Sequence, residues 1–588
     1  MRQTAAIFEP FVPLARITLG DGLHAGPREA WVEPLARLLE AASRGVGQLS
    51  LSECPLPADA PPAFFAREGD CVLLPRNAAF WRELRATVEA RWSQPVAHFA
   101  DAAVKAALDS ILPHDVQRAP DGRVIFDNAQ QRLAASAFVD ARIGVLTGGP
   151  GTGKTTSAAT LLAMRKRLEP ALRAEDVLLC APTGKAACRL ADSLSSASNR
   201  LQLGQDEQAF LSALQPMTLH KALEWTPLPP EGGGPFRRGP SRPLAQRLVL
   251  VDEASMVDLA LMAYLLRALQ PDAALLLLGD SDQLESVDTG GVLAELVTRG
   301  AAGTPPAAME VRWRARLDAE PGPILRHGLP SRPHTQPLPG LVVGLRYSFR
   351  AKAAPWVLEL AAIAQPGHTG TAATFLACCE RHAAHVRVHR RSRDLHAACQ
   401  ERWKDARRQT DGWRAAKLPT ETAIRSVLLA FQLLCGSNAQ VARANRLGLA
   451  VFWGQHPQRA GVSVPHGCPI LVTQNSYALG LSNGDVGIAL GAGPDRPAEV
   501  AVFPGLEAPI PLPELPNYQP AFALTIHKSQ GSEWQTVAIE LPDEGELLDR
   551  NLLYTAITRS SGGLELCLGG AKTLQGVLDG ATPAEPAV

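Results

Sequence analysis

The sequence has little that would place the chain in a membrane or around a metal cluster. No apolar run among its 588 residues approaches the roughly 18 that a membrane-spanning helix needs, and residues 1–17 lack the continuous apolar core of a secretion signal. The ten cysteines contain no C-x-x-C pair and no zinc-ligand spacing, which indicates buried small apolar side chains. We therefore expect a cytoplasmic protein with no membrane partner and no structural metal.

No charge of one sign dominates either, because 58 basic side chains face 58 acidic ones. This balance argues against a protein that coats a polyanion with its whole surface, although a local basic groove stays compatible with it. An apolar content of 46% and a charged content of 20% are typical of a globular protein. At about 150 residues per domain, the length predicts about three to five structural units.

The clearest chemical signal is a glycine-rich stretch at 148–155, GGPGTGKT, with the apolar run 143–146 before it and a helical pattern after it. Strand, glycine loop and helix in this order predict a phosphate-binding loop, whose backbone N–H groups close around phosphate oxygens. Lys154 would reach the β and γ phosphates, and Thr155 would offer its hydroxyl to Mg²⁺. ATP and Mg²⁺ are the predicted cofactors. The predicted nucleotide-binding residues of this stretch are Gly148, Gly149, Pro150, Gly151, Thr152, Gly153, Lys154, Thr155 and Thr156.

Other polar side chains suit the same nucleotide. Gln131, on a predicted helix before the loop, could present its amide to the adenine edge. Asp252 and Glu253 follow the apolar strand 247–251, where the first could hold Mg²⁺ through water and the second could polarise the attacking water. Gln283 follows another apolar strand and could sense the γ phosphate. Four strand ends at one nucleotide predict a single α/β ATPase domain.

Three stretches could contact the phosphates of a nucleic acid. Residues 181–187, APTGKAA, open a helix, so Thr183 and Lys185 suit a phosphate, with a plain connection between elements as the alternative. Thr218 and His220 could make a second backbone contact. Thr525, His527 and Lys528 sit at a predicted strand end further on, in TIHKSQGSE.

Residues 226–246 are crowded with Pro, Gly and Arg and predict a projecting hairpin. Phe236, Arg237 and Arg238 near its tip combine an aromatic ring with two cations, as a strand-contacting projection would. A disordered linker is the alternative.

The remaining sequence divides around the ATPase domain. Residues 1–115 predict a helical domain that docks a partner, with a simple buttress of the ATPase as the alternative. The ATPase domain should cover 116–335. Residues 336–588 predict a second α/β domain without a phosphate loop, whose use would be to close over the first. Short strand-like pieces at about 461–515 predict a small antiparallel barrel inserted into it. The strands of this second α/β domain itself are predicted at 386–389, 426–431, 522–526, 536–540 and 564–568.

Two arginines of the second domain could reach the γ phosphate across the cleft. Arg559 ends the segment YTAITR, and Arg350 ends YSFR. An arginine supplied by the moving domain couples closure to catalysis. Taken singly, either one could instead be a surface ion pair.

In this order the motifs resemble those of the superfamily 1 helicases. They are Gln131, GGPGTGKT at 148–155, APTGKAA at 181–187, VDEASM at 251–256, GDSDQLESV at 279–287, YSFR at 347–350, TIHKSQGSEW at 525–534 and LLYTAITR at 552–559. The wording of GGPGTGKTT, HKSQGSE and LVTQNSYALGLSNGDVGI resembles the RecD family of superfamily 1B in particular.

The resemblance implies two RecA-like P-loop NTPase-type domains in tandem and an SH3-like barrel within the second. It implies an ATP-dependent DNA helicase moving 5′ to 3′ on single-stranded DNA, within a heterotrimer that has RecB-like and RecC-like subunits. Such complexes process duplex DNA ends for recombination repair and degrade linear DNA. It also implies γ-phosphate roles for Gln283, Arg350 and Arg559, and it places the threonines, histidines and lysines of the three DNA-contact stretches along the strand.

Two departures from the family pattern bear on these roles. Ala351 stands where an aromatic residue often follows the arginine of YSFR, and residues 436–449 lack the expected glycine- and proline-containing loop. Two alternative functions stay open, a free-standing helicase without partners and a nucleotide-gated structural subunit that does not hydrolyse ATP. No acidic cluster outside the ATPase motifs suggests a nuclease, so DNA cleavage would belong to a partner chain.

Overall fold

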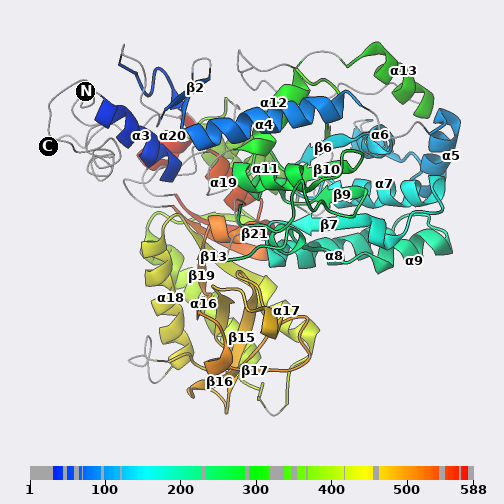
Figure 1. Ribbon diagram of the computed structural model, residues 1–588. Coiled ribbons are helices and arrows are strands. Elements are labelled where there is room, and N and C mark those ends of the chain that lie inside the picture. The colour runs from blue at the N-terminus through cyan, green and yellow to red at the C-terminus, as the bar shows by residue number, and fades with distance from the viewer. Residues whose placement is uncertain are drawn as a thin grey trace.

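The computed structural model describes most of the chain. The described residues are 31–43, 49–57, 65–68, 71–94, 99–118, 122, 124–227, 234–284, 291–302, 305–317, 337–345, 354–365, 369–415, 417–454, 463–541, 550–568 and 571–579. Two parallel β-sheets flanked by helices and one smaller antiparallel sheet make up most of this part (Figure 1). The fold class is therefore α/β, as predicted.

The first sheet has six strands, all parallel. In sheet order they are β11 (Val342–Leu345), β6 (Ile143–Gly148), β10 (Ala274–Gly279), β9 (Leu248–Val251), β7 (Val177–Ala181) and β8 (Met217–Thr218). The central strands are apolar at almost every position because helices cover both faces of the sheet. Successive side chains point to opposite faces, so Val249 and Leu250 belong to two different cores.

Helices pack on each face of the first sheet (Figure 1). One face is covered by α4 (Pro75–Trp92), α10 (Leu219–Ala222), α11 (Leu259–Ala268) and α12 (Val292–Ala301). The other is covered by α5 (Asp101–Ile111), α6 (Ala129–Phe138), α7 (Lys154–Leu168), α8 (Gly184–Ser198), α9 (Gln205–Ala213) and α13 (Ala307–Arg316). A hairpin of β4 (Val116–Arg118) and β5 (Val124–Asp127) precedes α6, and the 3-10 turns η3 (Ala174–Asp176) and η4 (Ala254–Met256) lie in loops.

Elements on both sides of residues 116–335 contribute to the first sheet and its cores. Strand β11 lies beyond residue 335, yet it pairs with the outer edge of β6, which would otherwise carry unpaired backbone groups. Helices α4 and α5 lie before residue 116, yet they contribute apolar side chains to the two cores of the first sheet. The apolar face of each helix is buried against the first sheet.

The described residues before α4 form a small sheet with a helix beside it, and Leu73 of this sheet packs into a core of the first sheet. A three-stranded antiparallel sheet has the order β1 (Leu49–Ser50), β3 (Cys71–Leu73) and β2 (Ala66–Glu68). Helix α3 (Val32–Ser43) packs beside it around Trp31, whose ring centroid lies 4.9 Å from that of Phe65. This region thus combines a sheet with a helix.

The second sheet has five strands, again all parallel. In order they are β12 (Val386–Val388), β21 (Ser560–Cys567), β20 (Trp534–Glu540), β13 (Phe431–Cys435) and β19 (Ala523–Thr525). One face carries α14 (Pro355–Ala364), α15 (Ala372–Arg381), α19 (Arg550–Ile557) and α20 (Ala571–Asp579), and the other carries α16 (Ser392–Thr410) and α18 (Asn438–Trp453).

The strand predicted at 426–431 was wrong, because those residues lie mainly in helix α17 (Glu421–Ala430). Thr420 caps that helix by accepting a hydrogen bond from the Ala423 N–H. Ile424 packs its apolar side chain against the antiparallel sheet. The strand begins only at Phe431, so a continuous apolar run concealed a helix followed by a strand.

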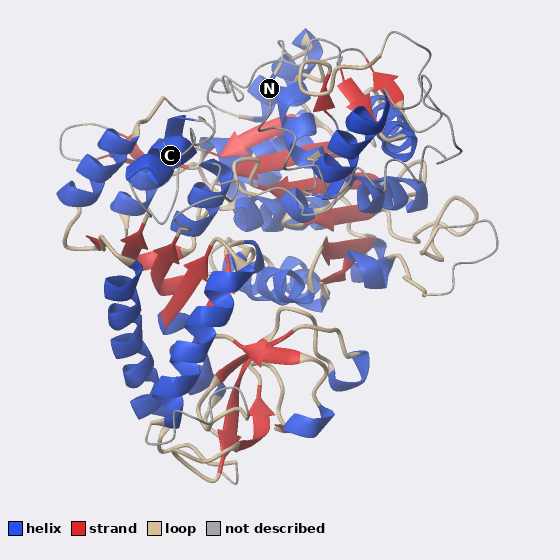
Figure 2. Cartoon of the chain, turned by 90° about the vertical axis from the view of Figure 1, so that its left-hand side faces the viewer, coloured by secondary structure: helices blue, strands red, loops and turns tan. Residues whose placement is uncertain are grey.

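The predicted insertion is an antiparallel sheet between α18 and β19, visible as the lower part of Figure 2. Its order is β17 (Ile510–Pro511), β16 (Ala498–Val502), β15 (Val486–Gly491), β14 (Pro469–Val472) and β18 (Tyr518–Pro520). The 3-10 turns η7 (Tyr477–Leu479), η8 (Leu512–Glu514) and η9 (His527–Ser529) lie in or after it. Gly484, with φ +99°, forms part of the turn before β15.

Part of the predicted hairpin at 226–246 lies outside the described residues, and the rest folds back onto the first domain. Phe236 is buried, with its ring centroid 5.2 Å from that of Tyr264. Arg238 forms an ion pair with Glu224 at 2.8 Å. The proposed role of Phe236 at an exposed tip was therefore wrong, because the apolar ring found a place in the core.

Candidate active site

The phosphate loop joins the end of β6 to the start of α7. Gly151 (φ +71°) and Gly153 (φ +89°) hold left-handed backbone conformations that other residues rarely adopt. The Lys154 ammonium donates hydrogen bonds to the carbonyl oxygens of Gly148 and Gly149, at 2.5 and 3.1 Å. Thr155 and Thr156 follow in the first turn of the helix, where its N–H groups and dipole favour an anion.

Gln131 lies against this loop on helix α6. Its side chain is buried, and its amide nitrogen donates to the Thr152 carbonyl at 2.8 Å. Thr152 in turn donates its hydroxyl to the Gly149 carbonyl at 2.8 Å. One amide N–H of Gln131 is thus used to support the loop, and its role on adenine stays a prediction.

The two predicted carboxylates follow β9 beside the loop. The pKa of Asp252 is raised to about 6, chiefly by burial and also by the Glu253 charge, while the Lys154 charge lowers it. Glu253 holds a left-handed backbone conformation with φ +50°, and its N–H donates to the Asp252 carboxylate at 2.9 Å. A desolvated carboxylate beside a second carboxylate suits a divalent cation, so these residues fit Mg²⁺ together with the Thr155 hydroxyl.

A further carboxylate, the buried Asp280, was missed. It lies directly after β10, and burial raises its pKa while Lys154 lowers it. The predicted Gln283 donates its amide to Asp280 at 3.0 Å, and Tyr554 of helix α19 donates its hydroxyl to the same oxygen at 3.1 Å. The strand-end position of Asp280 in GDSDQ was a signal that could have identified it. For Tyr554 only its closeness to Arg559 in the sequence gave a hint.

Tyr554 belongs to the second α/β unit, so this contact joins the two sheets at the nucleotide loop. A Cβ atom placed on Gly149 would lie 3.1 Å from the Tyr554 hydroxyl, so glycine allows the tyrosine to approach the loop. The Leu284 N–H donates to the Thr555 hydroxyl at 2.9 Å, and Gln530 donates to the Leu284 carbonyl at 2.7 Å. One phosphate loop is therefore bordered by both units.

The two predicted arginines differ in what can be described. Arg350 lies outside the described residues. Arg559 is buried after α19, where it donates to the carbonyl oxygens of Thr555 at 3.0 Å and Ser532 at 3.4 Å. Its charge lowers the pKa of Tyr554, against the larger effect of burial, which raises it. Arg559 thus lies in the electrostatic neighbourhood of the tyrosine that contacts Asp280.

Two of the predicted DNA-contact threonines serve as helix caps. Thr183 accepts from the Ala186 N–H at the start of α8, and Thr218 accepts from the Lys221 N–H at the start of α10, both at 3.2 Å. Each cap fixes a helix N-terminus whose backbone N–H groups suit a phosphate. The predicted contact residue next to the second cap, His220, is exposed, and burial of part of its ring lowers its pKa.

Lys185 lies between the two α/β units. Its ammonium sits 5.6 Å from the ring centroid of Trp534, and burial lowers its pKa to about 8. The neighbouring Gly184 is required by close packing, since a Cβ atom there would lie 2.1 Å from the Ser482 hydroxyl of the insertion. The lysine is thus more enclosed than a simple phosphate contact would require.

The third stretch borders a groove of about 330 Å³ beside helix α18. Thr525 and Lys528 line it together with Asn438, Arg446 and Gln519. The Thr525 hydroxyl accepts from the Lys528 N–H at 3.3 Å, while Lys528 itself is exposed and His527 half-buried. Amide, hydroxyl and cationic groups in one groove suit a sugar-phosphate backbone.

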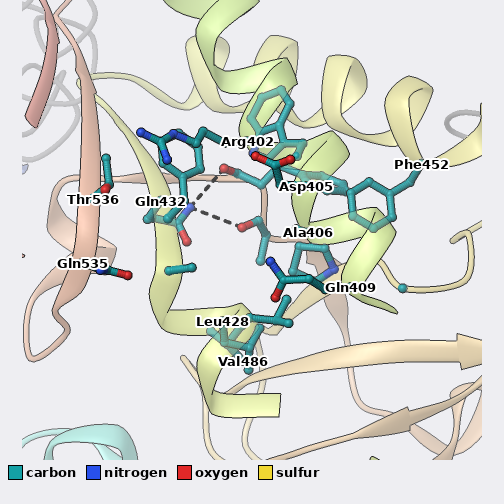
Figure 3. Close-up of a pocket in the computed structure, with 18 residues that line it drawn as sticks. Arg402, Asp405, Ala406, Gln409, Leu428, Gln432, Phe452, Val486, Gln535 and Thr536 are labelled. Carbon is teal, nitrogen blue, oxygen red and sulfur yellow. Dashed lines mark hydrogen bonds between the residues drawn. The ribbon is translucent and has the colours of Figure 1, made fainter. Parts of the chain in front are cut away.

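Another cavity, of about 230 Å³, lies within the second unit (Figure 3). Gln432 donates its amide to the carbonyl oxygens of Ala521 and Phe522 at 3.2 and 3.1 Å, and Arg402 and Asp405 lie at the rim. None of its lining residues belongs to the phosphate loop or its carboxylates, so it is separate from the nucleotide site.

One group of possible metal ligands occurs among the described residues outside the nucleotide site. Ligand atoms of Glu359, Cys378 and His382 lie within 4.8 Å of one another. The Glu359 carboxylate is already paired with Arg381 at 2.9 Å and with His382 at 3.0 Å. A cation there would have to compete with the guanidinium, which makes the group a surface ion-pair cluster.

Known proteins resemble the chain along most of its length. An AAA domain model matches residues 131–289, and a UvrD-like helicase C-terminal domain model matches residues 520–567. The RecBCD enzyme subunit RecD of Mycobacterium tuberculosis is 33% identical over 463 residues, covering 75% of this chain and 69% of that protein. The chain belongs to the RecD family. The ATP-dependent RecD2 DNA helicase of Deinococcus radiodurans is 29% identical over 438 residues, covering 71% of this chain and 46% of that protein.

The AAA domain match contains the phosphate loop and strands β6 to β10 of the first sheet, and the UvrD-like match contains β19, β20 and β21 of the second. A solved structure of Bacteroides Pif1 bound to single-stranded DNA covers 76% of this chain and 93% of its own, with 15% identity and a TM-score of 0.39. That likeness is too distant to support a statement about function. Among the described residues of this RecD-family chain, no helix is both long and apolar enough to cross a membrane.

Proposed function

We propose that this RecD-family chain is an ATP-dependent DNA helicase. It moves 5′ to 3′ along single-stranded DNA as the RecD-type motor of a complex with RecB-like and RecC-like subunits, which processes duplex DNA ends. The observation that carries the proposal is the single phosphate loop bordered by both α/β units, with Tyr554 of one unit bonded to Asp280 of the other at 3.1 Å. ATP binding draws the units together, and hydrolysis lets them part.

The chemistry falls to residues of the first unit. Lys154 and the loop N–H groups hold the β and γ phosphates, and Thr155 and Asp252 would hold Mg²⁺, which would supply positive charge to the phosphates. Glu253 orients the attacking water and takes its proton. Gln283, bonded to Asp280 at 3.0 Å, senses the γ phosphate. Gln131 supports the loop and faces the adenine.

The second unit completes the site on closure. Arg559 follows Tyr554 on the same segment and supplies positive charge to the γ phosphate, with Arg350 as a further contributor. DNA lies across both units, along Thr183, Lys185, Thr218 and His220 of the first and Thr525, His527 and Lys528 of the second. Contacts to the sugar-phosphate backbone suit a motor that must move along any sequence.

Finer features of the fold belong to the same proposal. The two parallel sheets are RecA-like motor domains, the antiparallel sheet is an SH3-like barrel, and the N-terminal region docks a partner subunit. The protein works in the cytoplasm, where its DNA substrate lies. DNA cleavage by the complex belongs to a partner chain.

A substrate comparison tests the proposal. The purified chain should hydrolyse ATP faster with single-stranded DNA present, and it should displace a strand from a duplex with a 5′ tail but not from one with a 3′ tail. ATP hydrolysis without any response to DNA would contradict the motor. Affinity capture from the native cell, followed by identification of companion chains, separates a RecBCD-type subunit from a free-standing helicase.

Tyr554→Phe should lower DNA-stimulated turnover. The change removes one hydroxyl and its bond to the buried Asp280 carboxylate, a net loss of about 0.5–1.5 kcal/mol, which corresponds to roughly two- to tenfold in rate. Steady-state ATPase rates at saturating DNA measure it. Tyr518→Phe, in the antiparallel sheet, is the matched control. Equal ATPase rates in Tyr554→Phe and Tyr518→Phe would show that the Tyr554 hydroxyl plays no part in DNA-stimulated turnover.

A further inference from the structure

An exposed tryptophan stands beside the predicted DNA-contact residues of α10. Among the described residues the exposed large apolar side chains are Val116, Trp225, Val311, Val388, Leu418 and Leu429, and Trp225 is the one aromatic in this set, 49% exposed. Trp225 comes three residues after the end of α10, which Thr218 caps. This places a large, flat and solvent-accessible ring close in the chain to the predicted backbone contacts Thr218 and His220.

The backbone around Trp225 is held in place from several sides. The Trp225 N–H donates to the His220 carbonyl at 2.9 Å, and Trp225 forms an isolated antiparallel bridge with Phe236. The Thr226 N–H donates to the Pro235 carbonyl at 2.9 Å. The backbone that carries the exposed indole ring is therefore held by hydrogen bonds on both sides.

Glu224, the residue before Trp225, has a strained backbone conformation. Glu224 has a left-handed backbone conformation, with φ +56°, which is strained in a non-glycine residue and persists only where the surrounding structure imposes it. Arg238 and Arg242 each pair with the Glu224 carboxylate at 2.8 Å. These pairs hold the turn that directs the chain into Trp225.

The backbone bridge partner of Trp225, Phe236, lies in an aromatic cluster, and exposed cations neighbour both residues in the chain. The Phe236 ring lies 5.7 Å from the ring of His220 and 5.2 Å from that of Tyr264, measured between centroids. Lys221 and Arg237 are exposed close to Trp225 in the chain and across the bridge, respectively. An exposed indole ring with exposed cations nearby in the chain suits a nucleobase attached to a phosphate backbone.

We propose that Trp225 is a stacking platform for a base of the single-stranded DNA. The bound class is a single-stranded oligonucleotide of any sequence, since each base offers a π face. The platform rests on the proposed function and extends it, because it adds a base contact to the backbone contacts of Thr218 and His220. Stacking on Trp225 gives the first unit a contact with DNA that does not depend on charge.

The test compares Trp225→Ala with Trp225→Phe. Binding of a fluorescein-labelled oligo-dT strand is followed by fluorescence anisotropy at several salt concentrations. Trp225→Ala should weaken binding by about 5- to 100-fold and Trp225→Phe by less, because the phenyl ring keeps part of the stacking surface. The salt dependence should stay unchanged in both, whereas Lys221→Gln should reduce its slope by about one, as expected for a lost phosphate contact.

Leu429→Ala, which truncates another exposed apolar side chain, is the control for a general surface effect. Oligonucleotides carrying 5-iododeoxyuridine should also crosslink to Trp225. Unchanged affinity in Trp225→Ala overturns the platform, as does a variant that binds DNA normally but no longer captures its companion chains. If the unaltered chain itself binds no DNA and its ATPase does not respond to DNA, the proposed function fails instead.

Discussion

Lys154→Gln is expected to reduce DNA-stimulated ATP hydrolysis by at least about 100-fold, because it removes the cation that stabilises charge on the transferred phosphoryl group. The lysine now bonds to the Gly148 and Gly149 carbonyl oxygens of its own loop, so the ammonium is already placed where phosphates would bind. Steady-state hydrolysis with saturating single-stranded DNA measures the effect.

Folding should be preserved in this variant, since the lost contacts are made by a partly exposed side chain with two loop carbonyls. Lys404→Gln is the matched control, because Lys404 is half exposed and pairs only across its own helix turn with Glu401. A Lys154→Gln protein that melts like the unaltered chain and still hydrolyses ATP at the normal rate would place the nucleotide elsewhere.

Arg559→Gln is expected to lower turnover by about 10³-fold or more while leaving ATP affinity within a few fold, as for other arginines that act in the transition state of phosphoryl transfer. The physical reason is that a neutral amide cannot offset charge on the γ phosphate. Arg559→Lys keeps the charge but loses the planar fork, so it should retain more activity than the glutamine variant. Single-turnover hydrolysis and nucleotide titration together measure the two effects.

Arg559 is buried and donates to two backbone carbonyls, so its replacement also has a structural cost. Thermal melting of each variant identifies that cost. Arg393→Gln, an exposed arginine beside Asp394, controls for loss of a positive charge. If Arg559→Gln is correctly folded, binds ATP and turns it over normally, the arginine plays no part in the chemistry.

The residues of the predicted ATPase chemistry could be identified in the sequence because they lie in short, contiguous segments. A loop such as 148–155 must have glycines, a lysine and a threonine in fixed order, since the backbone itself forms the phosphate cradle. The carboxylates Asp252 and Glu253 could be located because they end an apolar strand. Alternation of apolar and turn-forming residues likewise indicated the inserted antiparallel sheet.

Other features came from partners that lie far apart in the sequence. Strand β11 joined the first sheet because the edge of β6 needed hydrogen bonds, and Phe236 entered the core because Tyr264 lay within reach. The run 426–431 could be either strand or helix until the antiparallel sheet gave Ile424 an apolar surface. Local pattern alone does not say which surface will be available.

The nucleotide-binding segments were determined by the sequence alone, since their backbone geometry depends on the residues within them. Only the tertiary structure decided that Tyr554 would bond to Asp280, 274 residues away, and that Trp225 would remain in water. A hydrogen bond between two units and the exposure of a ring are properties of how surfaces meet. They follow from packing, which no single segment specifies.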